Sequence, residues 1–273
     1  MSPARSAPAV PPAPADHAFA GQAGNPDFVL SLARGLRVIE SFEGHRDGRT
    51  MIEISQSTGL SRASIRRILL TLELLGYVGH SRQVYRLKTQ VLRLGFSYLS
   101  SSSVVEAARP VLEHITEQVH ESSSMSMLDN GEIVYVVRSA ASRVLAAGLS
   151  VGSRLPAYCT SMGRVLLAAL PEEELDAYLH HLKPRAYTAK TRVRIPEIRQ
   201  AILKARNDGY AIVDEELEAG LRSIAVPVST RGNQVVAAIN VGTHISRIDR
   251  ATLIKRCLPA LQEGARTLRS ILI

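Results

Sequence analysis

The sequence predicts an α+β protein with two ordered parts, a helical N-terminal part and a C-terminal part in which strands alternate with helices. Three observations lead to this prediction. The chain has 273 residues, a length that suits two domains rather than one. Apolar residues recur at helical spacing up to about residue 119. From Ser123 onward, short apolar runs typical of strands are separated by further helical patterns.

The first 26 residues differ in composition from the rest of the chain. Residues 1–26 are rich in Pro, Ala, Gly and Ser and contain six of the thirteen prolines. Such a segment buries too little apolar surface to offset the entropy lost on ordering, so we expect a disordered tail. A recognition tail is the alternative. Order should begin near Asp27, with a helix whose apolar face runs from Val29 to Phe42.

Residues 27–88 are predicted to form the first domain. A second helix should run from Met51 to Thr58 and stop at Gly59, because glycine allows the chain to turn with a positive φ. Ser61 is a suitable N-cap for a third helix. Residues 77–87 are then predicted to form a short hairpin with a polar, basic tip. Three short helices followed by a basic hairpin are typical of a winged helix-turn-helix.

Positive charge is concentrated in this segment. The chain has a formal net charge of +8, which favours a polyanionic partner. Between residues 61 and 93 there are seven basic residues and a single acid, Glu73. The alternative is a three-helix packing in which the basic helix only faces solvent and has no role in DNA binding. Because the helices, the glycine turn, the basic hairpin and the local charge excess coincide, we expect the segment to bind double-stranded DNA.

The third helix is expected to enter the major groove. Arg62 and Arg66 are the candidates for base contacts, because arginine can bond a guanine edge with two hydrogen bonds. Arg67, Arg82 and Arg86 are expected to contact phosphates. The predicted DNA-binding residues are Ser61, Arg62, Ala63, Ser64, Arg66, Arg67, Arg82 and Arg86. A constitutive architectural protein, which binds DNA without sequence specificity or an effector, is the alternative from another class.

A helical linker is predicted over residues 89–110. Its first part, up to Tyr98, is amphipathic, and the serines from Ser100 to Ser103 indicate a break or hinge. A long helix should follow from Val104 to Val119, with Pro110 either kinking it or starting it afresh.

Residues 111–273 are predicted to form the second domain. The sequence Asp129-Asn130-Gly131 is a strong turn signal between strands at Met125–Leu128 and Ile133–Val137. Further strands are expected at 144–149, 210–213, 223–228 and 235–241, and helices at 161–170, from 171 onward, at 195–208 and at 249–271.

Two segments of this second domain contain groups that could bind a ligand. In residues 151–164, a loop runs into a helix with a small, polar start, and the free N–H groups of such a start suit a carboxylate. In residues 214–228, an acidic loop passes through Gly220 into a buried strand. Arg154 and Arg222 could neutralise a carboxylate, but they could equally form surface ion pairs.

The sequence does not favour an enzyme. Cys159 lies in no diagnostic motif, and cysteine occurs more often as a small buried residue than as a nucleophile. His180 and His181 are adjacent, so their side chains diverge and a metal site is not expected. No GxGxxG or Walker pattern occurs, and no cofactor is expected.

The cysteines and the hydropathy of the chain indicate the cellular compartment in which the protein works. The two cysteines, Cys159 and Cys257, are far apart and without a CxxC motif, which fits a reducing cytosol. No apolar run approaches the ~18 residues of a membrane span, and the N-terminus does not resemble a signal peptide. We therefore expect a cytoplasmic protein with no membrane partner.

The helix-turn-helix, together with two motifs, resembles the IclR family of transcriptional regulators. The motifs are Gly152-x-x-x-Pro156 with Thr160-Ser161-x-Gly163, and Gly220-Leu221-Arg222-Ser223-Ile224-Ala225-x-Pro227. The likeness covers residues 27–273. The start Asp27-Phe28, the run from Ser31 to Leu36 and the run from Leu155 to Arg164 are similar to the Pca and Pob regulators, which control protocatechuate and 4-hydroxybenzoate breakdown through the β-ketoadipate pathway.

The resemblance implies a GAF-like effector-binding and oligomerisation domain, a homodimer or tetramer, and a palindromic operator. It implies a small organic or aromatic acid as effector, with RNA polymerase as a further candidate partner. The expected effector-binding residues are Arg154, Leu155, Tyr158, Thr160, Ser161, Met162, Asp214, Arg222, Ser223 and Asn240. Relatives tuned to very small acids carry Gly-Ala where this chain has Ser161-Met162, which disfavours glyoxylate-like ligands. Both activation and repression, and several pathway acids as effector, remain open.

Overall fold

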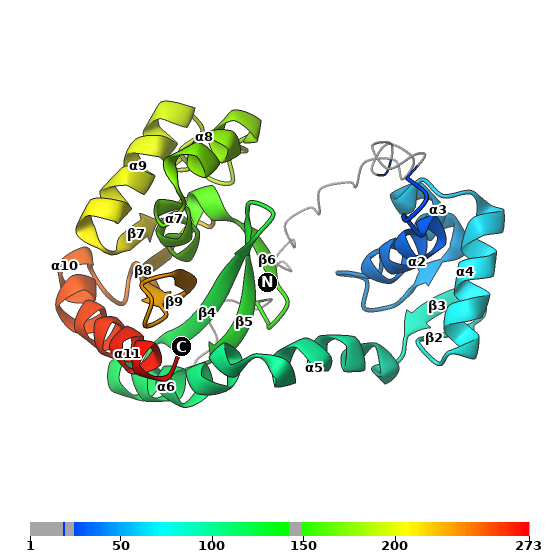
Figure 1. Ribbon diagram of the computed structural model, residues 1–273, viewed down its shortest axis with the longest axis horizontal. Coiled ribbons are helices and arrows are strands. Elements are labelled where there is room, and N and C mark those ends of the chain that lie inside the picture. The colour runs from blue at the N-terminus through cyan, green and yellow to red at the C-terminus, as the bar shows by residue number, and fades with distance from the viewer. Residues whose placement is uncertain (1–18, 20–24, 142–148, 273) are drawn as a thin grey trace. The chain divides into compact units, whose positions relative to one another are not determined.

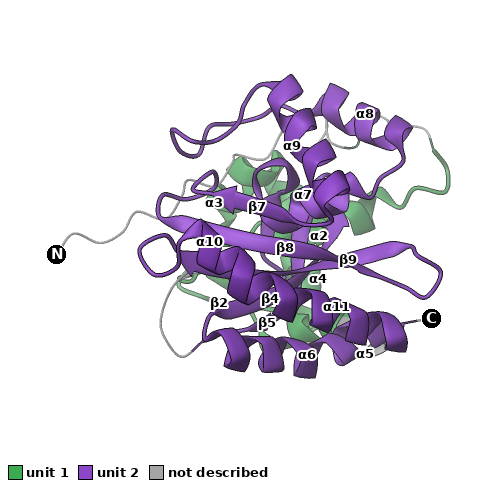
Figure 2. Cartoon of the chain, turned by 90° about the vertical axis from the view of Figure 1, so that its left-hand side faces the viewer, with its two compact units in different colours: residues 1–98 green, residues 99–273 purple. Residues whose placement is uncertain are grey.

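The structure is a computed structural model that describes residue 19 and residues 25–141 and 149–272, except for the side chains of residues 99–101. It divides between Tyr98 and Leu99 into two compact units, called unit 1 and unit 2 here (Figure 2). The division falls inside the region expected to be the linker. Most of the tail expected to be disordered, and most of the strand expected at 144–149, lie outside the described residues.

Unit 1 has the order of elements of a winged helix-turn-helix. These elements are α2 (Leu30–Glu40), β1 (Arg49–Thr50), α3 (Met51–Thr58), α4 (Arg62–Leu74), β2 (Val78–Ser81), β3 (Val84–Leu87) and the 3-10 helix η2 (Thr89–Val91). The three strands form an antiparallel sheet in the order β1-β3-β2, in which Val78 faces Leu87 and Arg49 faces Tyr85. The short strand β1 has no clear signal in the sequence.

Local hydrogen bonds set the bounds of the helix-turn-helix. Helix α3 begins with a capping box, in which the hydroxyl of Thr50 accepts from the N–H of Glu53 and the carboxylate of Glu53 accepts from the N–H of Thr50. These hydrogen bonds to Thr50 lower the pKa of Glu53. Gly59, with φ of +72°, ends the helix as expected. The hydroxyl of Ser61 accepts from the N–H of Ser64 and caps α4, as expected.

The core of unit 1 is small and aliphatic except for one phenylalanine. It consists of Val38, Phe42, Ile54, Leu60, Ile65, Leu69, Leu72 and Val78. Helix α4 contributes Ile65, Leu69 and Leu72, which lie on one face at helical spacing. The opposite face of α4 is therefore left to solvent.

The division between the units falls within helix α5 (Leu92–Ser101), and helix α6 (Ser103–Val119) follows in unit 2. Helix α5 ends at a break at Ser102, whose backbone is extended, and α6 begins directly after it. The break lies within the serine run that predicted it. Helix α6 continues through Pro110, so this proline does not restart the helix.

Unit 2 is built on a six-stranded antiparallel sheet with the order β6-β5-β4-β9-β8-β7. The strands are β4 (Ser122–Asp129), β5 (Glu132–Ser139), β6 (Arg154–Pro156), β7 (Ala211–Asp214), β8 (Leu221–Ser229) and β9 (Val235–His244). The helices are the 3-10 helix η3 (Ala157–Cys159), α7 (Ser161–Ala168), α8 (Glu172–His181), α9 (Ile195–Asp208), α10 (Arg250–Thr252), the π-helical segment η4 (Leu253–Cys257) and α11 (Leu258–Ile271).

The sheet separates two hydrophobic layers. Helices α6 and α11 pack on one face, and α7 lies on the other face with α8 and α9 beyond it (Figures 1 and 2). Leu112 and Leu261 are buried in the first layer, and Met162 and Ile198 in the second. This α/β arrangement confirms the mixed fold class predicted for the chain.

The C-terminal helix differs from the single helix expected over residues 249–271. It consists of α10, the π-helical segment η4 and α11. Pro259 lies in the first turn of α11 and has no N–H to donate to the carbonyl four residues earlier. The wider turn of the π-helical segment, directly before this proline, accommodates the missing bond.

Candidate functional site

The exposed face of α4 carries the arginines expected to contact DNA. Arg62, Ala63, Arg66 and Arg67 are exposed, and Ser64 is half-buried. Ser61 directly precedes them as the helix cap. The basic side chains therefore stand at and near the start of a helix whose other face is fixed in the core.

The hairpin of β2 and β3 forms a wing beside this helix. Its two-residue turn consists of Arg82 and Gln83, which have φ values of +49° and +67°. Both side chains are exposed, as is that of Arg86 on β3. Within the described residues, no carboxylate pairs with Arg62, Arg66, Arg67, Arg82 or Arg86.

Glu73, the single acidic residue between residues 61 and 93, contacts the wing. The carboxylate of Glu73 on α4 lies 2.7 Å from Nδ1 of His80 on β2. It is therefore turned toward the hairpin, and the arginines at the start of α4 keep their positive charge for a polyanion. The arrangement fits a DNA backbone and base edges.

Unit 2 contains a cavity of about 90 Å³ between the sheet and the start of α7. Strands β4, β5, β8 and β9, the start of α7 and the segment before β8 contribute to its wall. The lining residues are Ser122, Ser124, Tyr135, Arg138, Leu149, Leu155, Cys159, Thr160, Ser161, Met162, Val213, Leu217, Glu218, Ala219, Gly220, Leu221, Ser223, Asn240, Gly242, Thr243 and His244.

Two buried polar atoms of this wall have no hydrogen-bond partner. They are Oγ of Ser161, in a residue 1% exposed, and Oδ1 of Asn240, in a residue 7% exposed. Thr160 uses its hydroxyl to accept from the N–H of Gly163. The N–H groups of Ser161 and Met162, in the first turn of α7, donate to no acceptor among the described residues. Unsatisfied buried polar groups cost free energy, so a polar ligand or a water molecule that bonds them would bind favourably in this cavity.

The charge of the wall favours an anion. Arg138 on β5 is half-buried and makes no ion pair within the described residues. Burial raises the pKa of the Cys159 thiol to about 12 and that of the Tyr135 hydroxyl to about 12, so both groups are neutral at pH 7. Glu218 contributes a carboxylate to the cavity lining, but this residue is exposed. A carboxylate could therefore enter without meeting a buried negative charge.

The structure brings together six of the ten residues expected to bind an effector. Leu155, Thr160, Ser161, Met162, Ser223 and Asn240 all line the cavity. Residues from β4 and β5, among them Ser122, Ser124 and Arg138, line it too and were not expected. Strand β4 lies beside β9, where Ser124 faces Asn240, and only this long-range pairing places the two strands at one cavity.

The other four expected residues do not line the cavity. Arg154 forms ion pairs with Asp129 and Glu132 at 2.7 and 2.8 Å. Asp214 and Arg222 face each other across β7 and β8 and form an ion pair. Both Arg154 and Arg222 therefore form ion pairs, which is the alternative to carboxylate binding that the sequence left open.

Tyr158 is the fourth of these residues. It is buried against the second hydrophobic layer, and its hydroxyl donates to the carbonyl of Arg185 at 2.6 Å. Its hydrogen bond is satisfied within the protein, so it needs no ligand.

Neither a cluster of metal-binding side chains nor a membrane-spanning helix is found in the described residues. No group of three or more His, Cys, Asp or Glu side chains there could hold a metal ion. None of the helices in that part of the chain is long and apolar enough to cross a membrane.

Known proteins with similar sequences and structures are transcriptional regulators. The chain is 45% identical to a Pca regulon regulatory protein of Pseudomonas putida over 246 residues, which cover 90% of this chain and 84% of that protein. It is similar to the crystal structure of a transcriptional regulator from Rhodococcus, with 46% identity and a TM-score of 0.80, over 90% of this chain and 98% of that one.

A third match concerns unit 2. The inducer-binding domain of a double mutant of the transcription factor PobR from Acinetobacter, solved with 3-hydroxybenzoic acid, is 31% identical and has a TM-score of 0.57. The match covers 60% of this chain and 96% of that domain.

Two family models match the chain. The IclR helix-turn-helix domain matches residues 31–81, and the C-terminal domain of bacterial IclR transcriptional regulators matches residues 96–270. Together they cover unit 1, with its basic helix face, and unit 2, with its cavity. The chain belongs to the IclR family of DNA-binding transcriptional regulators.

Proposed function

We propose that this regulator controls genes of aromatic-acid catabolism and that the cavity in unit 2 binds its effector, a small aromatic or related organic acid. The observation that carries the proposal is the pair of unpartnered buried atoms, Oγ of Ser161 and Oδ1 of Asn240, in a cavity lined also by Arg138, which pairs with no carboxylate of the described residues. The similar Pca regulator and the PobR domain with 3-hydroxybenzoic acid point to the same class of ligand.

The effector carboxylate would lie at the start of α7. There the N–H groups of Ser161 and Met162 and the positive end of the helix dipole favour a negative charge. Leu155 and Leu217 offer apolar surface for a ring or carbon chain. Asn240 lines the cavity from β9 and could hydrogen-bond a second polar group of the ligand.

Operator binding would use unit 1. Arg62 and Arg66 would read base edges, and Arg67, Arg82 and Arg86 would contact phosphates. Two or four copies of the chain would bind a palindromic operator, because symmetric half-sites match a symmetric oligomer. Acting on operator DNA, the protein would work in the cytoplasm.

A thermal-shift and DNA-binding experiment on the whole chain tests this proposal. Benzoate, 3-hydroxybenzoate, 4-hydroxybenzoate, protocatechuate and β-ketoadipate are added separately, and the melting temperature is recorded. A ligand at a hundredfold excess over its Kd should stabilise the native state by about 2.7 kcal/mol. The same ligand should change the footprint on, or the affinity for, the DNA upstream of an aromatic-acid catabolic operon.

The outcomes separate the two halves of the proposal. If none of these acids raises the melting temperature, the effector assignment is wrong. If competition with unrelated DNA abolishes binding as effectively as operator DNA does, the protein is an architectural DNA-binding protein instead.

A further inference from the structure

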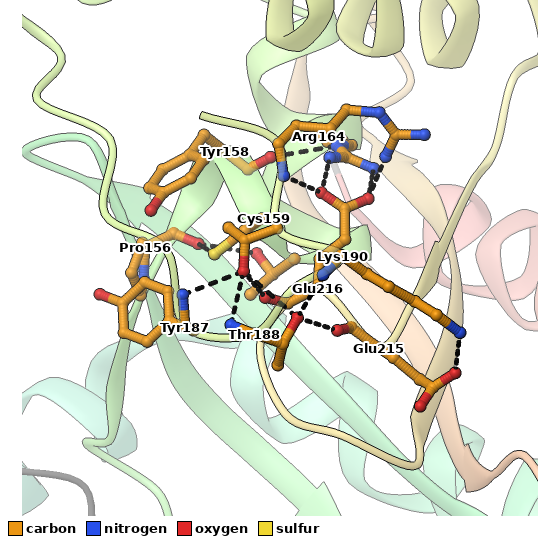
Figure 3. A network of polar contacts seen from close by, with 12 residues as sticks. Pro156, Tyr158, Cys159, Arg164, Tyr187, Thr188, Lys190, Glu215 and Glu216 are labelled. Carbon is orange, nitrogen blue, oxygen red and sulfur yellow. Dashed lines mark hydrogen bonds and ion pairs between the residues drawn. The ribbon is translucent and has the colours of Figure 1, made fainter. Parts of the chain in front are cut away.

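Unit 2 contains a buried ion pair that the proposed ligand contacts do not use. Arg164 on α7 donates to both carboxylate oxygens of Glu216, at 2.8 and 2.6 Å (Figure 3). The two side chains are each only 3% exposed. The Nε of Arg164 also donates to the carbonyl of Tyr158 at 3.0 Å. A bidentate pair of this kind fixes the orientation of its partners as well as their distance.

The ion pair connects two parts of the cavity wall. Arg164 lies on the first turns of α7, two residues after Met162, which lines the cavity. Glu216 directly precedes residues 217–221, and all five of these line the cavity. The pair therefore holds the segment before β8 against the helix at which the effector carboxylate is proposed to bind.

Hydrogen bonds fix residues 215–220, which connect β7 to β8. At one end, the hydroxyl of Thr188 donates to the carbonyl of Glu215 (Figure 3), and the hydroxyl of Thr191 donates to the carbonyl of Glu216. At the other end, the N–H of Gly220 donates to the carboxylate of Glu215 at 3.0 Å. The carboxylate of Glu216 adds a direct, bidentate contact between this segment and α7.

A second arginine completes the environment of this carboxylate. Arg192 donates to Glu216 through its side chain and through its N–H. Its side chain is 44% exposed, so it neutralises charge at the rim, whereas Arg164 fixes the carboxylate from within. The buried carboxylate is thus fully partnered, in contrast to Ser161 and Asn240.

Stability alone is a weak reason for such a pair. Removing two charges from water is costly, and replacing a buried ion pair by apolar side chains of similar volume is often neutral or stabilising. What apolar side chains do not provide is a fixed distance and angle between two chain segments.

We propose that Arg164 and Glu216 are positioning residues, which set the separation between the start of α7 and residues 217–221 and thereby the effector affinity of the cavity. This inference rests on the proposed function, because it takes the cavity to be the effector site. It goes further in assigning a role to two residues that touch no ligand.

The test compares three forms of the whole chain: the wild type, the double variant Arg164→Met/Glu216→Leu and a control, Arg199→Met/Asp176→Leu. The control removes the ion pairs that Arg199 on α9 forms with Asp176 and Glu172 on α8, and none of these residues lines the cavity. Circular dichroism and thermal unfolding report the fold, calorimetric titration with 4-hydroxybenzoate reports the Kd, and hydrogen exchange without ligand reports the backbone of residues 217–221.

The expected result is a folded double variant with a Kd raised on the order of tenfold, since a binding site loosened by a fraction of an ångström loses affinity of that order. Exchange of residues 217–221 should be faster than in the wild type, and the control should match the wild type in both measurements. A double variant with unchanged Kd and unchanged exchange overturns the inference.

Two other outcomes are also decisive. If the double variant does not fold, Arg164→Lys is used, which keeps the charge but not the bidentate geometry; weakened binding by a folded Arg164→Lys supports positioning, whereas its unfolding shows that the pair serves only stability. If the wild type does not bind 4-hydroxybenzoate, the titration has tested the effector assignment, and unchanged exchange in the folded double variant still overturns the role of the ion pair.

Discussion

The basic face of unit 1 and the cavity of unit 2 both present polar groups without partners among the described residues, but in different surroundings. The arginines of α4 and the wing are exposed, so water solvates them and their lack of partners costs little. Ser161 and Asn240 are buried, and each unpaired polar atom there costs about 1–3 kcal/mol. An unpaired polar atom is therefore a stronger sign of a bound polar partner when it is buried in the cavity than when it is exposed on the surface.

The two regions also depend differently on the rest of the fold. The DNA-binding face consists of side chains on one helix and one hairpin, which are close in the sequence. The cavity depends on strands from both halves of unit 2 and on the close approach of α7 to the preceding turn. Damage to packing should therefore affect the cavity first.

The substitution Gly163→Ala should have the largest effect. A Cβ at this position would lie 2.2 Å from the carbonyl oxygen of Ala157, and backbone cannot move aside as a side chain can. We expect a loss of about 3 kcal/mol in the free energy of unfolding of unit 2, measured by thermal or urea unfolding. Gly232→Ala, where the added Cβ meets only ordinary contacts, is the control. Equal stability of the two variants would show that α7 is not packed as described.

The substitution Arg66→Ala should affect the other region alone. If Arg66 reads a base, specific operator binding weakens by about 1–3 kcal/mol and specificity relaxes at one position. Effector-induced stabilisation should not change, because Arg66 is exposed on unit 1. Binding assays on operator and on single-base variants provide the measurement, with Arg67→Ala for comparison. A uniform loss on all sequences would make Arg66 a phosphate contact.

The sequence allowed much of unit 1 to be predicted, because its signals are local. Gly59 and the Ser61 cap are read directly from the chain, and the structure has both. The residues of α4 that face solvent follow from its helical periodicity. The structure adds the strand β1, which has only two residues and pairs with β3, so no periodic pattern marks it.

The cavity could be predicted only in part. The start of α7 was identified because a helix N-terminus and the family motif share one segment. Ser122, Ser124 and Arg138 were missed because strand alternation does not say which face of a strand meets the cavity, and only the pairing of β4 with β9 decides it. Conversely, Arg222 was expected to be available to a ligand, but the register of β7 and β8 places it opposite Asp214.

The substitution Asn240→Leu should separate binding from stability. The Oδ1 atom has no partner, so a leucine of similar size should leave the unfolding free energy unchanged or slightly raised. Effector affinity should fall about tenfold if the amide bonds the ligand. Calorimetric titration with the acid selected by the thermal-shift screen measures the affinity, and operator binding without effector is the control. Unaltered affinity would place the ligand elsewhere in the cavity.

The substitution Gln83→Gly should have the smallest effect, and it acts on the wing. Gln83 has a φ of +67°, in the left-handed region that a side chain disfavours, and a two-residue turn of this kind prefers glycine. Glycine relieves the strain but adds freedom to the unfolded chain, so we expect a net gain of about 0.5 kcal/mol in the stability of unit 1. Urea unfolding measures the gain, and Gln83→Ala, which keeps the Cβ, should show none. Operator affinity should stay the same, because Arg82 still carries the charge at the tip; a marked loss would mean that Gln83 itself contacts DNA and that the strained turn is retained for its side chain.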